Sequence, residues 1–153
     1  MPGGKNVNLK SNQLGDIEIQ EDQVVNFPLG IPGFEDHHQF AIFALDESSP
    51  FFYMHSVSDA DLCLVLGVPF VFFPDYELEL GEDGQDILGV EKSDEEMAVF
   101  VVLTIPEDFK ETTANLVAPV VVNPTTRTGI QYVQGNSSYQ IRNRIFSSEG
   151  QGK

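Results

Sequence analysis

The chain has 153 residues, 41% of them hydrophobic, which is enough to build the core of one domain. Its 24 acidic and 8 basic side chains give a formal charge of −16, which disfavours direct contact with nucleic-acid phosphates or an anionic membrane and favours a basic partner. Residues 1–110 hold 22 of the acidic and 4 of the basic side chains, so the remainder of the chain is mildly cationic. A role in solubility is the alternative explanation for the negative charge.

The apolar runs are too short to cross a membrane, and Met1–Lys5 lacks the apolar stretch of a secretory signal. The single cysteine, Cys63, excludes an internal disulfide and a cysteine-rich zinc site. We therefore expect a soluble, cytoplasmic protein.

Most apolar runs are short, rich in β-branched and aromatic residues, and bounded by turn residues, a pattern typical of strands. The expected strands are Asp16–Ile19, Val24–Phe27, Phe40–Leu45, Phe51–Val57, Leu62–Leu66, Tyr76–Leu80, Met97–Ile105, Leu116–Val122, Ile130–Gln134 and Tyr139–Arg142. Tyr76–Leu80 alternates between apolar and acidic residues, which predicts one buried face and one wet face. Met97–Leu103 is almost entirely apolar, as a central strand would be.

Few segments have helical character. Glu82–Leu88 and Pro106–Thr112 are the candidates, the second with proline at the favoured first position. Ser93 and Glu96 have the spacing of a capping box, with a plain turn as the alternative. Because few helices are available to cover so many strands, we predict a mostly-β fold: a small closed or nearly closed β-barrel with one or two short helices.

The segment Gly30–Asp36 has an unusual turn composition. Pro32 restricts its own φ and pushes Ile31 toward an extended conformation, while Gly33 can adopt the positive φ of the second corner of a type II turn. Such a turn predicts that Ile31 and Phe34 pack and that the two acidic residues at its end face water. A buried turn that only connects two strands is the plainer interpretation.

The residues that could carry catalysis or bind metal lack the neighbouring side chains and the spacing that these functions require. Cys63 lies in an apolar run, where burial would keep the thiol neutral. His37 and His38 are adjacent and His55 stands alone, so they do not have metal-ligand spacing. The carboxylates of Glu82–Asp86 do not follow the alternation of a calcium loop. We predict no catalytic residue, no cofactor and no metal.

Two further segments do not suit simple packing. In Val68–Glu77, three phenylalanines lie between two prolines that exclude a regular central strand, so the rings plug the core or anchor a partner. In Thr113–Asn123, Pro119 indicates an edge or a bulge, and Asn115 and Asn123 can satisfy turn backbone.

Taken in order, three motifs resemble the FliW family of bacterial flagellar assembly factors. They are Gly-Ile-Pro-Gly-Phe-Glu at 30–35, Phe-Phe-Pro-Asp-Tyr-Glu at 72–77 and Ala-Asn-Leu-Val-Ala-Pro-Val-Val-Val-Asn at 114–123. The acidic segment Asp46–Phe52 adds to the resemblance, which spans Leu9–Phe146.

Two positions depart from the pattern that we expect of this family. Val117 stands where a polar residue is usual, and Arg142–Ile145 replaces an ending with His-Pro. The departures leave the fold prediction unchanged and bear on contacts made by the C-terminal part. The resemblance implies one FliW-like barrel domain over residues 9–146, and composition predicts flexible tails at 1–8 and 147–153.

The resemblance implies a protein without enzymatic activity that binds flagellin and, alternately, the RNA-binding translational regulator CsrA. In this scheme accumulated flagellin occupies the assembly factor and leaves the regulator free to repress flagellin translation, and export of flagellin reverses this. The charge of −16 suits a cationic regulator. Both competitive and indirect inhibition of RNA binding remain open.

We expect partner contacts from aromatic anchors flanked by carboxylates. The candidate residues are Phe73, Asp75, Tyr76, Glu77 and Glu79, followed by Phe34 and Asn123. Two alternatives are kept. A small-molecule-binding or hydrolytic barrel would need a polar pocket around Asp75 and Tyr76. A general acidic mimic of nucleic acid would bind many basic proteins instead of one.

Overall fold

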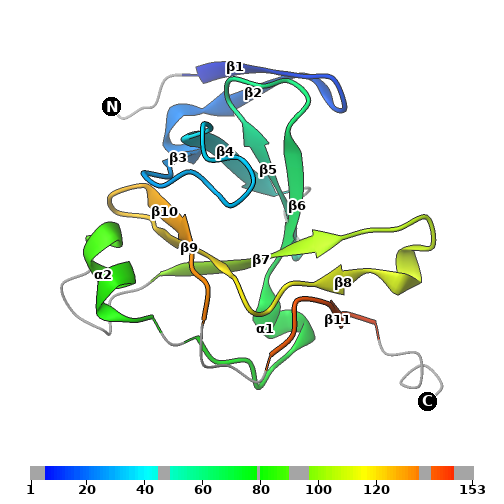
Figure 1. Cartoon of the computed structure of the whole chain (residues 1–153). Coiled ribbons are helices and arrows are strands. Elements are labelled where there is room, and N and C mark those ends of the chain that lie inside the picture. The colour runs from blue at the N-terminus through cyan, green and yellow to red at the C-terminus, as the bar shows by residue number, and fades with distance from the viewer. Residues whose placement is uncertain (1–5, 45–48, 79, 90–96, 135–138, 147–153) are drawn as a thin grey trace.

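The structure, a computed structural model, describes residues 6–44, 49–78, 80–89, 97–134 and 139–146 (Figure 1). The strands are β1 Asn6–Ser11, β2 Gly15–Gln20, β3 Val24–Asn26, β4 Gln39–Ala44, β5 Phe51–Ser56, β6 Cys63–Gly67, β7 Ala98–Thr104, β8 Thr113–Ala114, β9 Val120–Asn123, β10 Thr128–Gln131 and β11 Asn143–Arg144. The helices are α1 Pro69–Phe72 and α2 Glu82–Leu88, with 3-10 turns η1 Glu21–Gln23 and η2 Phe109–Glu111.

Seven strands form a closed barrel in the order β7-β6-β5-β4-β3-β10-β9, because β9 also pairs with β7. The β3–β10 pair is parallel, and its neighbours are antiparallel. One edge of β7 has two partners: Ala98–Phe100 pairs with β9, and Leu103–Thr104 pairs with β8. The second half of β7 therefore extends the sheet past the ring into β8 and β11. The predicted mostly-β barrel is confirmed.

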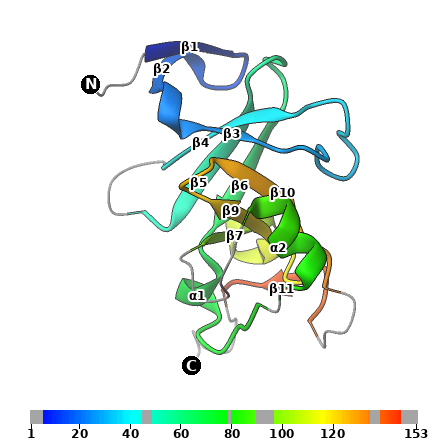
Figure 2. The ribbon, with the colours of Figure 1, turned by 90° about the vertical axis from the view of Figure 1, so that its left-hand side faces the viewer.

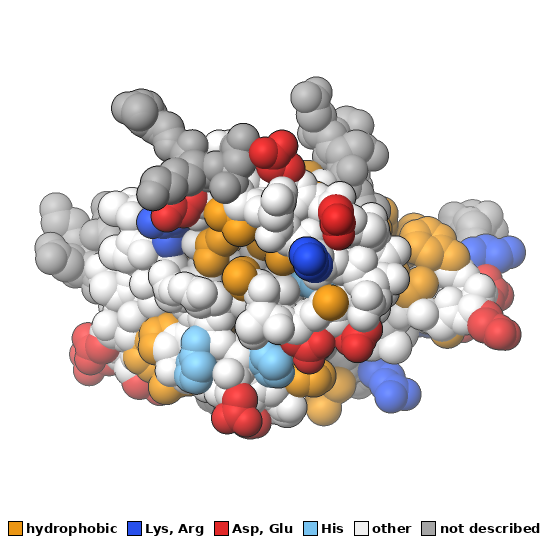
Figure 3. Space-filling view, turned by 90° about the horizontal axis from the view of Figure 1, so that it is seen from above, with side chains coloured by type: hydrophobic (Ala, Val, Ile, Leu, Met, Phe, Trp, Pro, Cys, Tyr) orange, Lys and Arg blue, Asp and Glu red, His pale blue; other side chains and the backbone are white. Residues whose placement is uncertain are grey.

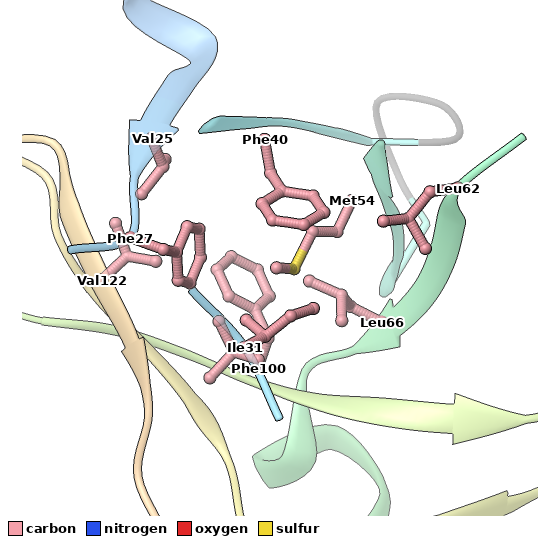
Figure 4. Packing of buried hydrophobic residues seen from close by; sticks show 10 residues of the cluster. Val25, Phe27, Ile31, Phe40, Met54, Leu62, Leu66, Phe100 and Val122 are labelled. Atoms are coloured by element: carbon pink, nitrogen blue, oxygen red, sulfur yellow. The ribbon is translucent and has the colours of Figure 1, made fainter. Parts of the chain in front are cut away.

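Large apolar side chains fill the barrel (Figure 4). Phe27, Phe40, Met54 and Leu66 are fully buried, and the rings of Phe27 and Phe40 pack edge to face at 5.5 Å. Ile31, from the turn between β3 and β4, joins the same cluster. A turn residue thus contributes to the core.

The outer surface of the barrel is also covered, in three places. The β1–β2 hairpin packs on one side, α2 packs against β10, and a layer containing α1, β8 and β11 lies at the opposite end from the hairpin (Figures 1 and 2). Along β7, Phe100 faces the barrel core and Val101 the layer of α1. Along β9, Val120 faces the barrel core and Val121 faces α2. Because β7 and β9 are buried on both faces, their sequences are almost wholly apolar.

The turn before β4 has the predicted type II geometry. Phe34 N donates to Ile31 O at 2.8 Å, and Gly33 has φ +89°. Gly30, at φ +67°, lies so close to the backbone of Glu35 that a Cβ would approach its oxygen to 2.6 Å. Ile31 is buried as predicted, but the prediction that Phe34 packs is wrong, since 40% of its surface is exposed.

Four predicted segments of secondary structure are wrong in type or extent. The described residues of Tyr76–Leu80 form no strand, because Tyr76 N bonds back to Phe73 O and Glu77 N bonds to the hydroxyl of Tyr139 instead of to a neighbouring strand. Tyr139–Arg142 is irregular, and the short β11 follows it. Pro106–Thr112 contains only the 3-10 turn η2. The strand predicted from Leu116 begins at Val120, after Pro119.

Other differences concern the N-terminal region and α1. Asn6–Asn8 belong to β1, paired with Glu18–Gln20, and so are not part of a flexible tail. The α1 helix, with Pro69 at its first turn, was not predicted. By contrast, α2 has its predicted limits, Glu82–Leu88, and is followed by the C-cap residue Gly89, with φ +73°. The predictions for Ser93–Glu96 and 147–153 lie outside the described residues.

Candidate protein-binding site

The candidate site begins where α1 ends. Phe73 N donates to Pro69 O at 2.7 Å and Tyr76 N to Phe73 O at 2.9 Å, so the chain turns tightly on leaving the helix. The described residues between α1 and α2 have no regular structure and lie along the lower edge of the molecule in Figure 1. We call residues 73–78 and 80–81 the tyrosine-held segment, for the contacts described next.

Tyr76 fixes the segment from the inside. Its side chain is only 4% exposed, its hydroxyl donates to Leu116 O at 2.7 Å, and Gln134 Nε2 donates to the hydroxyl at 3.1 Å. Burial, followed by the proximity of Tyr139, raises the pKa of Tyr76 to about 12. The phenol therefore remains a neutral hydrogen-bond donor at physiological pH.

Two more tyrosines bond to the backbone of the segment from outside it. Glu77 N donates to the hydroxyl of Tyr139 at 2.9 Å, and Gly81 N donates to the hydroxyl of Tyr132 at 3.0 Å. These bonds take the place of strand pairing. The acidic side chains of Asp75 and Glu77 are exposed on a backbone that is held at several points.

Apolar surface lies next to these carboxylates. Phe70 and Val71 of α1 are 44% and 57% exposed, and the ring of Phe70 lies 6.0 Å from that of Tyr76. Phe73 is half-buried and packs against the cluster under α1. An apolar patch beside exposed carboxylates on a held backbone is suited to binding a protein with apolar and cationic groups.

Beneath this surface lies a layer of phenylalanines. The ring of Phe72 lies 5.7 Å from that of Phe51 and 6.4 Å from that of Phe146, and Phe109 lies 5.1 Å from Phe146. The layer joins α1, β5, η2 and the residues after β11, so the patch rests on a packed base.

The structure does not bring all the predicted contact residues together. Phe34 lies in the turn before β4 and Asn123 at the end of β9 beside α2, both away from α1 (Figure 1). Asn123 is buried, donating to Leu88 O at 2.8 Å and accepting from Thr125 N at 3.0 Å, which confirms its predicted role in satisfying turn backbone. Glu79 lies outside the described residues.

Some residues of the site were not predicted. Phe70 and Val71 fall in a segment that the sequence analysis treated as aromatic plug or anchor, and the two prolines around them were the available signal. Tyr132 and Tyr139 gave none, because a hydroxyl that bonds to backbone 51 or 62 residues away leaves no local pattern.

Among the residues that the structure describes, the other side chains capable of catalysis or metal binding are not grouped into a centre. Cys63 is half-buried, and burial raises the pKa of its thiol. His37 Nε2 lies 4.0 Å from a carboxylate oxygen of Asp59. In the described parts of the chain, no three His, Cys, Asp or Glu side chains are grouped so that they could hold a metal ion. Asp75 is exposed while Tyr76 points inward, so the two do not converge as the hydrolytic alternative requires.

No helix among the described residues has the length and apolar character needed to span a membrane.

The fold and the site define the class of protein. It is a small barrel whose outer surface is covered in three places, and it presents carboxylates beside an apolar patch on the tyrosine-held segment and α1. The FliW protein family matches residues 8–145. A flagellar assembly factor FliW of Syntrophomonas wolfei is 42% identical over 136 residues, covering 89% of this chain and 86% of that protein. Another, of Geobacillus kaustophilus, is 41% identical and covers 86% of this chain and 90% of that protein.

Solved structures agree. A crystal structure of the flagellar assembly factor FliW superposes with a TM-score of 0.83 at 37% identity, covering 94% of this chain and 99% of the other. The chain belongs to the FliW family of flagellar assembly factors, which confirms the resemblance seen in the three motifs.

Proposed function

We propose that this protein acts in the cytoplasm by binding, and not by catalysis, and that it binds flagellin and the translational regulator CsrA in alternation. Membership of the FliW family over nearly the whole chain carries the proposal. Occupancy by flagellin then leaves the regulator free to repress flagellin translation, and loss of flagellin lets this protein antagonise that repression.

We place a main contact on α1 and the tyrosine-held segment. Phe70, Val71 and Phe73 supply the apolar part, and Asp75 and Glu77 the charged rim. Tyr76 is a positioning residue in this proposal, because its side chain is buried and holds the backbone. A rigid backbone lowers the entropy lost on binding.

The net charge supports the choice of the regulator as one partner. A protein that grips RNA presents cationic surface, and a partner of charge −16 is attracted to it over a distance of several ångströms. Bound nearby, the same charge raises the cost of bringing RNA phosphates to that surface. We therefore expect the association rate to fall as salt is added.

The deciding experiment measures pairwise and three-way binding with purified flagellin and CsrA, by calorimetry and by competition. We expect each partner to bind alone and flagellin to displace the regulator. If neither partner binds the folded protein, the proposal is wrong. If both bind at once without weakening each other, alternation is wrong.

Charge variants test the location of the contact. Asp75→Asn with Glu77→Gln should weaken binding of the regulator about ten-fold at low salt, with little effect on stability, because both side chains are exposed. The matched control is Asp16→Asn with Glu18→Gln on β2, which makes the same charge change on the distant hairpin. Equal losses in both double variants would mean that overall charge, and not this segment, drives binding.

A further inference from the structure

A separate surface cavity, open to solvent and about 300 Å³ in volume, lies between the β1–β2 hairpin and the barrel. Its apolar walls are Val7, Val24 and Val57. Figure 3 looks onto the end of the molecule that carries the β1–β2 hairpin and shows hydrophobic side chains exposed among charged ones. The cavity is lined by residues from both the hairpin and the barrel, and it shares no residue with the tyrosine-held segment.

Polar groups complete the lining of the cavity. Asn26 and Gln39 are bonded to each other, with Gln39 Nε2 donating to Asn26 Oδ1 at 3.1 Å. Arg127, in the turn between β9 and β10, and Glu21, the first residue of η1, add one positive and one negative charge. The cavity therefore has an apolar wall, an amide pair and two opposite charges.

Arg127 adopts an unfavourable backbone conformation. Its φ is +55°, and it is alone among the described non-glycine residues in having a positive φ. Glycine would occupy this position without strain, whereas a side chain there costs about 1 kcal/mol. A side chain at such a strained backbone position is a starting point for a functional hypothesis, because strained residues cluster at binding and active sites.

The guanidinium is positioned but its charge is not paired. Arg127 Nη1 donates to the backbone oxygen of Glu21 at 2.7 Å. The ion pairs in the described part of the chain are His37–Asp59 and Arg144–Glu111, so Arg127 and Glu21 share a cavity without pairing with each other. In a protein with 24 acidic side chains, an arginine without a carboxylate partner retains donors for a ligand.

We propose that this cavity binds a small aliphatic α-amino acid. Arg127 would receive the carboxylate, Glu21 the ammonium group, and the three valines the aliphatic side chain. A phosphate ion would meet only one cation, beside a carboxylate and in the field of a strongly negative protein. A zwitterion instead satisfies both charges, and the volume is near the lower end of that of small-molecule sites.

The test uses L-leucine, followed by NMR chemical shifts of the backbone amides and by thermal unfolding. Saturable shifts are expected at Val7, Val24, Asn26, Gln39 and Arg127, with a rise in the unfolding temperature. Arg127→Gln and Glu21→Gln should each weaken binding about ten-fold or more, because each removes one charge-assisted contact. Arg142→Gln, the same change at an exposed arginine after the barrel, should leave binding unchanged.

Ligand analogues that lack one charged group test whether both charges of the amino acid are recognised. 4-Methylpentanoate lacks the ammonium group and 3-methylbutylamine lacks the carboxylate, and both should bind at least about ten-fold more weakly than L-leucine. If Arg127 only ties the turn to η1, Arg127→Gln will lower stability and no ligand will shift the amides. Absence of saturable shifts up to about 20 mM, or equal binding of either analogue, would overturn the proposal. If Arg127→Gln fails to fold, the affinity of Glu21→Gln for L-leucine tests the proposal, because Glu21 is exposed and its substitution should leave the fold intact.

Discussion

Two segments of this protein, the turn Gly30–Asp36 and the tyrosine-held segment, are stabilised by different kinds of interaction. The turn Gly30–Asp36 is shaped by its own backbone, through the bond from Phe34 N to Ile31 O and the positive φ of Gly30 and Gly33. The tyrosine-held segment has contacts with residues 40, 51 and 62 positions away. The first is encoded locally, whereas the second depends on the whole fold, and it is the second that we assign to partner binding.

Gly30→Ala should have the largest effect. The new Cβ would lie 2.6 to 2.8 Å from backbone atoms of Glu35, at a φ of +67° that disfavours alanine. We expect a loss of about 3 kcal/mol in the free energy of unfolding, measured by urea denaturation. Gly33→Ala is the control, because its φ is also positive but no atom beyond its two chain neighbours lies within 4 Å of the added Cβ, so only about 1 kcal/mol should be lost. Equal losses would mean that the close approach of Gly30 to Glu35 is unimportant.

Tyr76→Phe should follow, with a loss of about 2 kcal/mol, because it removes a buried hydroxyl that donates to Leu116 O and accepts from Gln134. The pH dependence gives a second measurement. The pKa of Tyr76 is about 12 in the folded protein, above its ordinary value of 10, so the unfolded chain loses this proton first as the pH rises. Stability from this group is complete below pH 10 and is lost toward pH 12, by up to about 1.4 kcal/mol per pH unit. Tyr76→Phe should reduce this slope, and an unchanged slope would contradict the prediction.

Tyr139→Phe should have a smaller effect on stability, about 1 kcal/mol or less, because Glu77 is exposed and its freed N–H can bond to water. We expect partner affinity to fall more than stability does, since the segment loses one of its fixed points. Denaturation and calorimetry on the same sample test this. Tyr53→Phe is the matched control, because the hydroxyl of Tyr53 on β5 makes no hydrogen bond with a described residue. An equal loss of partner affinity in Tyr53→Phe would contradict the prediction that the bond from Glu77 N to the Tyr139 hydroxyl contributes to binding.

Glu35→Gln should have the smallest effect. Its exposed carboxylate accepts from Gly33 N at 3.2 Å, and the amide oxygen of glutamine can accept the same bond. The change in the free energy of unfolding should stay below about 0.5 kcal/mol. A larger loss would show that the turn depends on this side chain more than on its backbone.

Local chemistry explains which predictions succeeded. The type II turn at Pro32-Gly33, the α2 helix ending at Gly89, and the Asn115 side chain that accepts from Val117 N each depend on residues within a few positions. Burial of the alternating Tyr76–Leu80 was also partly foreseen, since Tyr76 is buried and Leu78 and Leu80 pack under α2. The same alternation predicted a strand there, and no strand forms.

By itself the sequence determined the class of fold, the turns, the α2 helix and, through three ordered motifs, the family. Only the tertiary structure decided that β7 pairs with β9 to close the barrel, and that tyrosine hydroxyls hold the segment after α1. It also decided that Arg127 and Glu21 share a cavity. The physical reason is the separation along the chain of the residues that interact. Backbone conformation and amphipathic alternation are set by near neighbours, whereas strand closure, hydroxyl bonds and shared cavities join residues far apart in the chain.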